Sequence, residues 1–121
     1  MSDWFWGGVA VVGAAGACGR FLLDAVIAER ATHDFPIGTL TINATGSLLL
    51  GLLTGLALSG DLLLLLGTAT IGSYTTFSTW MLETHRLAEE GEIPAAIINV
   101  LLSLAVGVGA AALGRTIGAQ L

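Results

Sequence analysis

The chain has 121 residues, of which 55% are hydrophobic and only 11% are charged, and its formal net charge is −5. Soluble domains carry roughly 25% charged residues, so this composition argues against an ordinary soluble domain and indicates a protein that lies in lipid. All four basic residues are arginines and they are scattered along the chain, which excludes a basic surface for nucleic acid.

The first apolar segment runs from Trp4 to Leu23 and contains one charged residue, Arg20. Because about 20 mostly apolar residues cross a bilayer, we predict a transmembrane helix over residues 4–28. The start of the chain lacks the basic residues of a cleaved signal peptide, so we expect this helix to stay in the protein. Arg20 either extends its charge to the membrane surface or draws anions into the mouth of a pore.

Three further apolar segments predict helices over about residues 37–58, 62–87 and 93–117, which makes one domain of four spans over residues 1–121. Four spans place both termini on one side of the membrane. The arginines differ little between the two sides, so they do not fix an orientation. We therefore expect that the chain can insert both ways and that two opposite copies can form an inverted pair.

The third span is unusual because seven Ser or Thr residues and Tyr74 lie between Thr68 and Trp80, in the sequence TATIGSYTTFSTW. Glycine and β-branched residues weaken the helix here, so we predict a break at residues 72–75. A break in the membrane is tolerated only where protein or a cavity covers it. The freed carbonyls either hold a small cation or belong to a kink packed on a neighbouring helix.

Phe77 and Trp80 lie three residues apart and therefore share one face of a helix. Aromatic rings are positive at their edges, so two rings presented edge-on in a narrow pore attract a small anion. The hydroxyls of Thr76 and Thr79 would donate hydrogen bonds beside them and replace part of the hydration shell of the anion. The alternative is that the rings simply pack one helix against another.

Three further polar residues, on the second, third and fourth predicted spans, each have two interpretations. The Asn43 amide can donate to an anion or bridge two helices. Glu83 is either a charge at the membrane interface or a group at the pore mouth that acts on the ion. Ser103 lines a polar path along the fourth span or bonds to the backbone of its own helix.

Three segments together resemble the Fluc/CrcB fluoride channels: GAAGACGRFLL at 13–23, PIGTLTINATGSLLLG at 36–51 and GSYTTFSTWMLE at 72–83. The resemblance covers the whole chain in length and in its layout of four spans. It implies a fold class, an all-α membrane protein whose third helix is broken mid-membrane and which forms an antiparallel, dual-topology dimer. It also implies two fluoride pores and a structural sodium ion at the centre of the dimer.

Carried over position by position, the resemblance implies that Gly72 and Thr75 give backbone carbonyls to the sodium ion. It further implies that Asn43 and Phe77 line the pore. Trp80 occupies the place of a second phenylalanine, which is a departure from the family pattern. Ser73 and Tyr74 also replace residues that are commonly smaller or apolar.

The function predicted from the sequence is passive, fluoride-selective export across the cell membrane, which relieves fluoride toxicity. No enzymatic reaction is expected. The expected partners are fluoride, sodium, the lipid bilayer and a second antiparallel copy or a related subunit. One alternative is a small multidrug-type antiporter, although residues 4–23 contain no acidic residue for proton exchange. Another is a structural membrane subunit that carries no flux.

Overall fold

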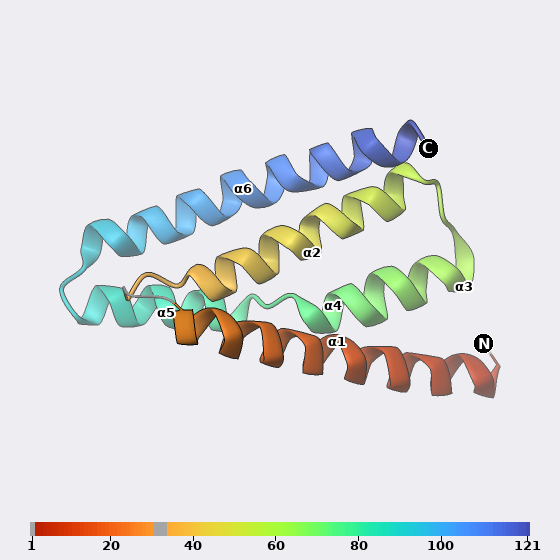
Figure 1. The fold of residues 1–121 in the computed structure, drawn as a ribbon, viewed down its shortest axis with the longest axis horizontal. Helices are drawn as coiled ribbons and strands as arrows, with labels where there is room; N and C mark the ends of the chain where they lie inside the picture. Colours follow the sequence, from red (N-terminus) through yellow and green to blue (C-terminus); the bar gives the residue numbers. More distant parts are fainter. Residues whose placement is uncertain (1, 31–33) are drawn as a thin grey trace.

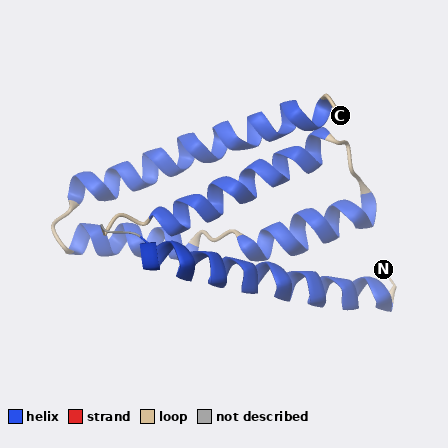
Figure 2. Ribbon diagram, viewed as in Figure 1, coloured by secondary structure: helices blue, strands red, loops and turns tan. Residues whose placement is uncertain are grey.

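Long apolar segments of this chain form long helices, as the computed structural model shows for residues 2–30 and 34–121. Over these residues the structure contains helices and turns but no strand (Figure 2). The elements in chain order are α1 (Asp3–Arg30), α2 (Ile37–Gly55), α3 (Gly60–Leu63), the π-helix η1 (Leu64–Ile71), α4 (Gly72–Tyr74), α5 (Ser78–Glu89) and α6 (Ile93–Ala119). Residues 31–33, between the first two predicted spans, lie outside the described residues.

Among the residues that the structure describes, three helices, α1, α2 and α6, are long and apolar enough to cross a membrane. The remaining span of the predicted four is the consecutive run of α3, η1, α4 and α5, which residues 75–77 interrupt. Figure 1 shows α6, α2, this composite segment and α1 following one another across the molecule. Both termini lie at the same end, as an even number of crossings requires.

Close backbone contact joins α2 to α6. A Cβ atom added at Gly51 or Gly55 of α2 would meet a backbone carbonyl of α6, and one added at Gly114 or Gly118 would meet a carbonyl of α2. In each helix the two glycines are four residues apart, which is the small-residue spacing that lets membrane helices approach closely. The contacts advance along both helices together, so α2 and α6 run in the same direction.

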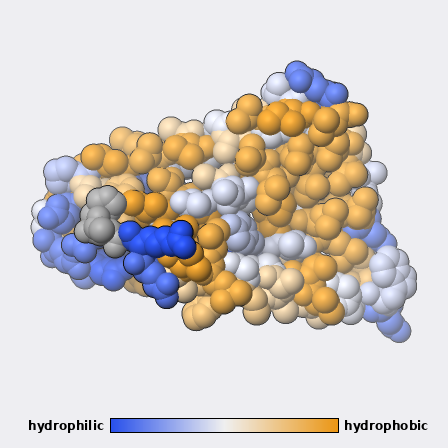
Figure 3. All heavy atoms as spheres, viewed as in Figure 1, coloured by the Kyte–Doolittle hydropathy of each residue, from blue (hydrophilic) through white to orange (hydrophobic). Residues whose placement is uncertain are grey.

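The outer surface of the helices is strongly apolar. Many large hydrophobic side chains are exposed, including Trp4, Phe21, Leu101 and Val108, and Figure 3 shows apolar atoms over the middle of the molecule with hydrophilic atoms gathered toward its ends. A water-soluble protein rarely exposes so large a contiguous apolar surface. This surface fits lipid or another apolar protein face.

Two helices end with a residue in the left-handed backbone conformation. Gly91 (φ 82°) follows α5 and Ala57 (φ 59°) follows α2. In both cases the next residue, Glu92 or Leu58, donates its N–H to a carbonyl five positions back, which is the Schellman motif. Glycine adopts this conformation freely, whereas alanine does so at a cost in free energy. The turn at Ala57 ends α2 at Gly55, before residue 58, where the predicted helix ended.

The helix break spans residues 75–77, so the predicted break at 72–75 is correct at Thr75 but begins three residues too early. Gly72 and Tyr74 remain helical, and the Thr75 N–H still donates to the Ile71 carbonyl over 2.9 Å. Thr75 itself is extended, with ψ 160°. A hydroxyl contact of 2.8 Å between Tyr74 and Thr45 of α2 anchors the last helical residue.

Candidate ion pathway

The break is held open by one side chain from another helix, Asn43 of α2. Its Nδ2 atom donates to the Thr76 carbonyl over 2.8 Å, and the Thr76 N–H donates to Asn43 Oδ1, also over 2.8 Å. The amide therefore replaces both backbone partners that Thr76 would have in a continuous helix. This paired contact explains why the chain leaves the helix at Thr75 and resumes it at Ser78.

Backbone carbonyls are freed just before the break. Within the described residues, the carbonyl oxygens of Gly72 and Thr75 accept no hydrogen bond from the backbone outside the helices, and no side chain donates to them. The Thr75 hydroxyl turns back to the Ile71 carbonyl at 3.0 Å. Gly72 is exposed on the surface of the chain and Thr75 is half-buried. Both oxygens therefore lack a hydrogen-bond donor among the described residues.

A hollow of about 380 Å³ lies against the break, between α2 and the composite segment. Its lining includes Asn43, Gly72, Thr75, Phe77 and Trp80. The predicted pore residues Asn43, Phe77 and Trp80 therefore line one hollow together with the two predicted sodium ligands. Its lining is mostly apolar, with a few polar groups near the break, which is typical of a small-ligand site.

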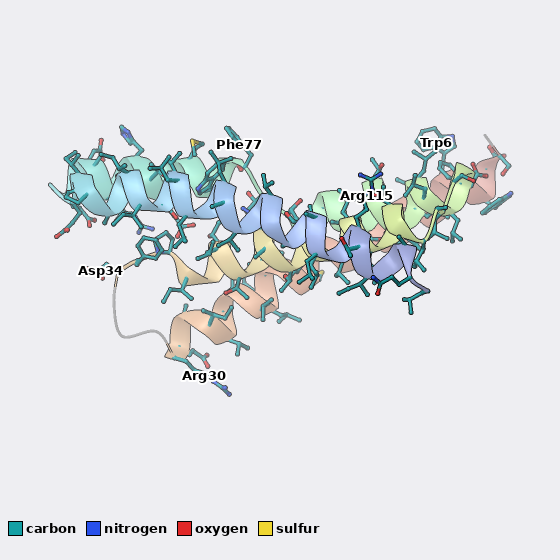
Figure 4. The ribbon with its side chains drawn as sticks, turned by 90° about the horizontal axis from the view of Figure 1, so that it is seen from above. Trp6, Arg30, Asp34, Phe77 and Arg115 are labelled. Atoms are coloured by element: carbon teal, nitrogen blue, oxygen red, sulfur yellow. The ribbon has the colours of Figure 1, made fainter. Side chains whose placement is uncertain are left out.

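The two predicted ring residues form a perpendicular pair. The ring centroids of Phe77 and Trp80 are 5.6 Å apart, and the ring planes meet at 85°. In this T-shaped arrangement the positive edge of one ring meets the negative face of the other. Phe77 is 69% exposed, and Figure 4 shows it projecting away from the helices. Trp80 is half-buried, and its indole N–H donates to the Asn99 carbonyl of α6 over 3.2 Å.

The hydroxyls of Thr76 and Thr79 bond to one another at the start of α5. Thr76 Oγ1 donates to Thr79 Oγ1 over 3.1 Å and accepts from the Thr79 N–H over 3.2 Å. The second contact has the i to i+3 pattern of a helix cap. Within the described residues the hydroxyl hydrogen of Thr79 has no acceptor. Of these two hydroxyls, the one of Thr79 can therefore donate to an ion.

A second hollow, of about 340 Å³, lies between α2, α5 and α6 and includes Ser103 in its lining. Asn43, Ser47 and Trp80 line this hollow as well as the first. The Ser103 hydroxyl donates to Asn99 Oδ1 at 3.5 Å, a long contact at the limit of hydrogen bonding. Ser103 therefore faces a polar neighbour instead of bonding to its own backbone.

Glu83 and Arg20 lie away from these two hollows. Glu83 accepts a hydrogen bond from the buried hydroxyl of Thr39 on α2, and it lines a small recess of about 100 Å³ near Asp34 and Arg86. The recess is at a charged end of the molecule. Arg20 lines neither hollow, and its Nε atom is buried with no hydrogen-bond partner among the described residues.

Asn99 of α6 is a polar residue whose importance the sequence analysis missed. It is only 1% exposed, and its Nδ2 atom donates to the Thr84 hydroxyl of α5 over 2.8 Å. An asparagine within a 27-residue apolar helix is itself a signal, because a buried amide needs partners. Thr39 was missed too, although it lies one helical turn before Asn43 and therefore on the same face of α2.

Comparison with known proteins places these features in a family. A family model described as "CrcB-like protein, Camphor Resistance (CrcB)" matches residues 8–115. The chain is 52% identical over 110 residues to "Fluoride-specific ion channel FluC 2" of Mycolicibacterium paratuberculosis. This alignment covers 91% of the chain and 90% of the relative. It is 44% identical over 119 residues to "Fluoride-specific ion channel FluC 1" of Symbiobacterium thermophilum. That alignment covers 93% of the chain and 96% of the relative.

Proposed function

The chain belongs to the CrcB-like family, and from this membership and the geometry of the break we propose that it is a fluoride-selective ion channel. It is a multi-pass membrane protein that lets fluoride leave the cell passively across the cell membrane and so relieves fluoride toxicity. The observation that carries the proposal is the hollow in which Asn43, Phe77 and Trp80 meet beside the break. No chemical reaction is part of it.

Ring electrostatics and hydroxyl donors give the hollow its preference for a small anion. An anion beside the edges of Phe77 and Trp80 is attracted without a full opposite charge, so it is held weakly enough to leave again. The Thr79 hydroxyl lies two residues after the break and lines neither hollow, so it supplies its donor beside the hollow, where it replaces part of the lost water. Glu83 and Arg20 act outside this hollow, at the mouths of the pathway.

A second copy of the chain, in the opposite orientation, completes the pathway. In hydrocarbon, irregular backbone survives only where protein or a water-filled cavity covers it. Here the backbone at residues 75–77 is irregular, Gly72 is exposed, and the Phe77 ring projects from the chain. An antiparallel copy, or a related subunit, covers these groups and gives each pore its second wall.

A structural sodium ion fits the carbonyls freed at the break. The Gly72 and Thr75 oxygens are hard ligands without other partners among the described residues, which suits an alkali cation. One chain offers two such oxygens and an antiparallel pair offers four, so the ion belongs at the contact between copies. When bound, sodium supplies a fixed positive charge that ties the two breaks together.

The runner-up function, a small multidrug-type antiporter, is not favoured. Such a carrier needs an acidic residue in the membrane for proton exchange, and residues 4–23 of α1 contain none. A structural subunit without flux would have no need of a hollow lined by two aromatic side chains and an amide. The named relatives are fluoride-specific ion channels, in agreement with the leading proposal.

Fluoride efflux from liposomes tests the proposal. Purified protein is reconstituted, and fluoride release is followed with a fluoride electrode, once under a membrane voltage and once under a pH gradient alone. A channel releases fluoride in response to voltage, whereas a proton-coupled antiporter responds to the pH gradient. Release that requires the pH gradient, or no release under either condition, contradicts the proposal.

A further inference from the structure

Tyr74 is the last helical residue before the break and the only tyrosine of the chain. We propose that it is a positioning residue for the sodium site, because its hydroxyl holds the short helix α4 on α2 and so sets the spacing of the Gly72 and Thr75 carbonyl oxygens. The inference rests on the sodium ion of the proposed function. It concerns a residue that departs from the family pattern and that lines neither hollow of the candidate pathway.

The hydroxyl of Tyr74 is the donor in its contact with Thr45 of α2. The two oxygens are 2.8 Å apart, a distance at which either could donate. Thr45 Oγ1, however, also lies 2.8 Å from the Thr41 carbonyl and 3.1 Å from the Ile42 carbonyl, and a carbonyl can only accept. The single hydroxyl hydrogen of Thr45 is therefore directed to its own helix. The hydrogen between the two helices comes from the phenol of Tyr74.

The break straddles one face of α2. At about 3.6 residues per turn, Asn43 and Thr45 lie on nearly opposite flanks of this helix. Between them lie Ile42 and Gly46, both of which are buried. A Cβ atom added at Gly46 would collide with Cγ2 of Thr75, so the chain passes directly over this glycine. Asn43 therefore holds the passing chain on one flank, and Thr45 holds it on the other.

The two anchors act on different carbonyl oxygens. The Thr76 N–H that donates to Asn43 belongs to the same peptide group as the Thr75 carbonyl. This peptide is trans, so the Thr75 oxygen points away from the Asn43 amide. Gly72 lies two residues before Tyr74 on α4, so its carbonyl moves with the helix that the phenol holds. Asn43 thus orients one sodium ligand, and Tyr74 places the other.

Within the part of the chain that the structure describes, the bond from Tyr74 is the one hydrogen bond that joins α4 to another helix. The Ser73 hydroxyl bonds only to Ala69 and Thr70 of its own segment. The number and spacing of carbonyl dipoles decide which alkali ion they suit. Loss of the phenol hydroxyl would therefore loosen α4 and blur the spacing of the oxygens. In an antiparallel pair this change affects both copies.

Sodium-dependent unfolding tests the site without a measurement of flux. The purified protein is unfolded by heat in sodium salt and in N-methylglucamine salt, and the rise of the unfolding temperature with sodium concentration gives an apparent sodium Kd. Tyr74→Phe keeps the ring and removes only the hydroxyl. Thr45→Val removes the acceptor, and Thr45→Ser keeps it. Thr54→Val is the matched control, because the Thr54 hydroxyl also bonds to the carbonyl four residues back on α2 but has no partner on another helix among the described residues.

We expect Tyr74→Phe and Thr45→Val to raise the apparent sodium Kd by about tenfold, which is the scale of one lost hydrogen bond. The preference for sodium over lithium and potassium should weaken in both variants. Thr45→Ser and Thr54→Val should stay within about twofold of the wild type. A hydroxyl with a purely structural role would lower the unfolding temperature equally in both salts and leave the sodium Kd unchanged, and that result would overturn the inference.

The double variant Tyr74→Phe with Thr45→Val provides a second test. It should bind sodium about as well as either single variant, because both changes break one hydrogen bond, and fully additive losses contradict the inference. The wild-type protein separates the inference from the proposed function. If it responds to sodium and Tyr74→Phe matches it, only the inference fails. If the wild type unfolds identically in both salts, the structural sodium ion is refuted and the inference with it. Fluoride release from liposomes, measured separately, decides whether the chain is a channel.

Discussion

Replacing Asn43 with leucine should release the break from α2. The variant has a side chain of similar size but loses both hydrogen bonds to Thr76, and it leaves a backbone N–H and a carbonyl without partners. At about 1.5 kcal/mol for each lost bond, the two together destabilise the local structure by about 3 kcal/mol. Since every 1.4 kcal/mol is a factor of ten, the break should open about a hundredfold more often.

Amide hydrogen exchange of the protein in lipid nanodiscs measures this opening directly. The Thr76 amide should exchange about a hundredfold faster in Asn43→Leu than in the wild type. Asn43→Asp should lie between them, with about a tenfold increase, because a carboxylate still accepts the Thr76 N–H but cannot donate to its carbonyl. Fluoride efflux from liposomes should fall by at least about tenfold in the leucine variant.

Ser47→Ala is the matched control for this experiment. Ser47 lies one helical turn after Asn43 and lines the same two hollows, but its hydroxyl makes no hydrogen bond within the described residues. The alanine variant should keep wild-type exchange at Thr76. If Asn43→Leu exchanges within about twofold of the wild type, the amide does not hold the break and the reasoning fails.

Three further predictions concern packing, backbone strain and the aromatic pair. Gly114→Leu should abolish the folded species in size-exclusion chromatography, because a side chain at this position meets the backbone of α2. Gly109→Ala should elute normally, since no atom lies within 4 Å of a Cβ added there. Ala57→Gly should stabilise the protein by about 1 kcal/mol in thermal unfolding, because glycine adopts the left-handed conformation without strain, and an unchanged melting temperature would count against it. Phe77→Ile should reduce fluoride efflux at least about tenfold, while Phe21→Ile on the exposed surface of α1 should leave efflux unchanged. Equal effects of the two substitutions would show that the Phe77 ring has no specific role in fluoride efflux.

The sequence predicted the span layout because composition alone controls it. Long segments with few charges formed α1, α2 and α6. The broken third segment was also predictable, since glycine and β-branched residues weaken a helix. Its position was not, because the residue that sets it, Asn43, is 33 positions away and acts through a contact that no local pattern reveals.

The π-helix η1 and the partner of Trp80 were beyond sequence reasoning for a similar reason. In η1 the Thr70 hydroxyl reaches the Leu65 carbonyl five residues back, yet its sequence also suits an ordinary α-helix. The sequence marks Trp80 as a departure from the family pattern, but only the packing of α6 shows that a backbone carbonyl accepts its indole N–H. Sequence identified the groups, and tertiary contacts decided their partners.

Selective release of fluoride tests directly whether the chain is a fluoride channel. Liposomes that contain the wild-type protein are loaded with equal concentrations of fluoride and chloride, and both anions are followed in the same sample with ion-specific electrodes. The account predicts that fluoride leaves far faster than chloride and that protein-free liposomes retain both. Equal rates for the two anions would contradict it, because a hollow walled by Asn43, Phe77 and Trp80 would then not select a small anion.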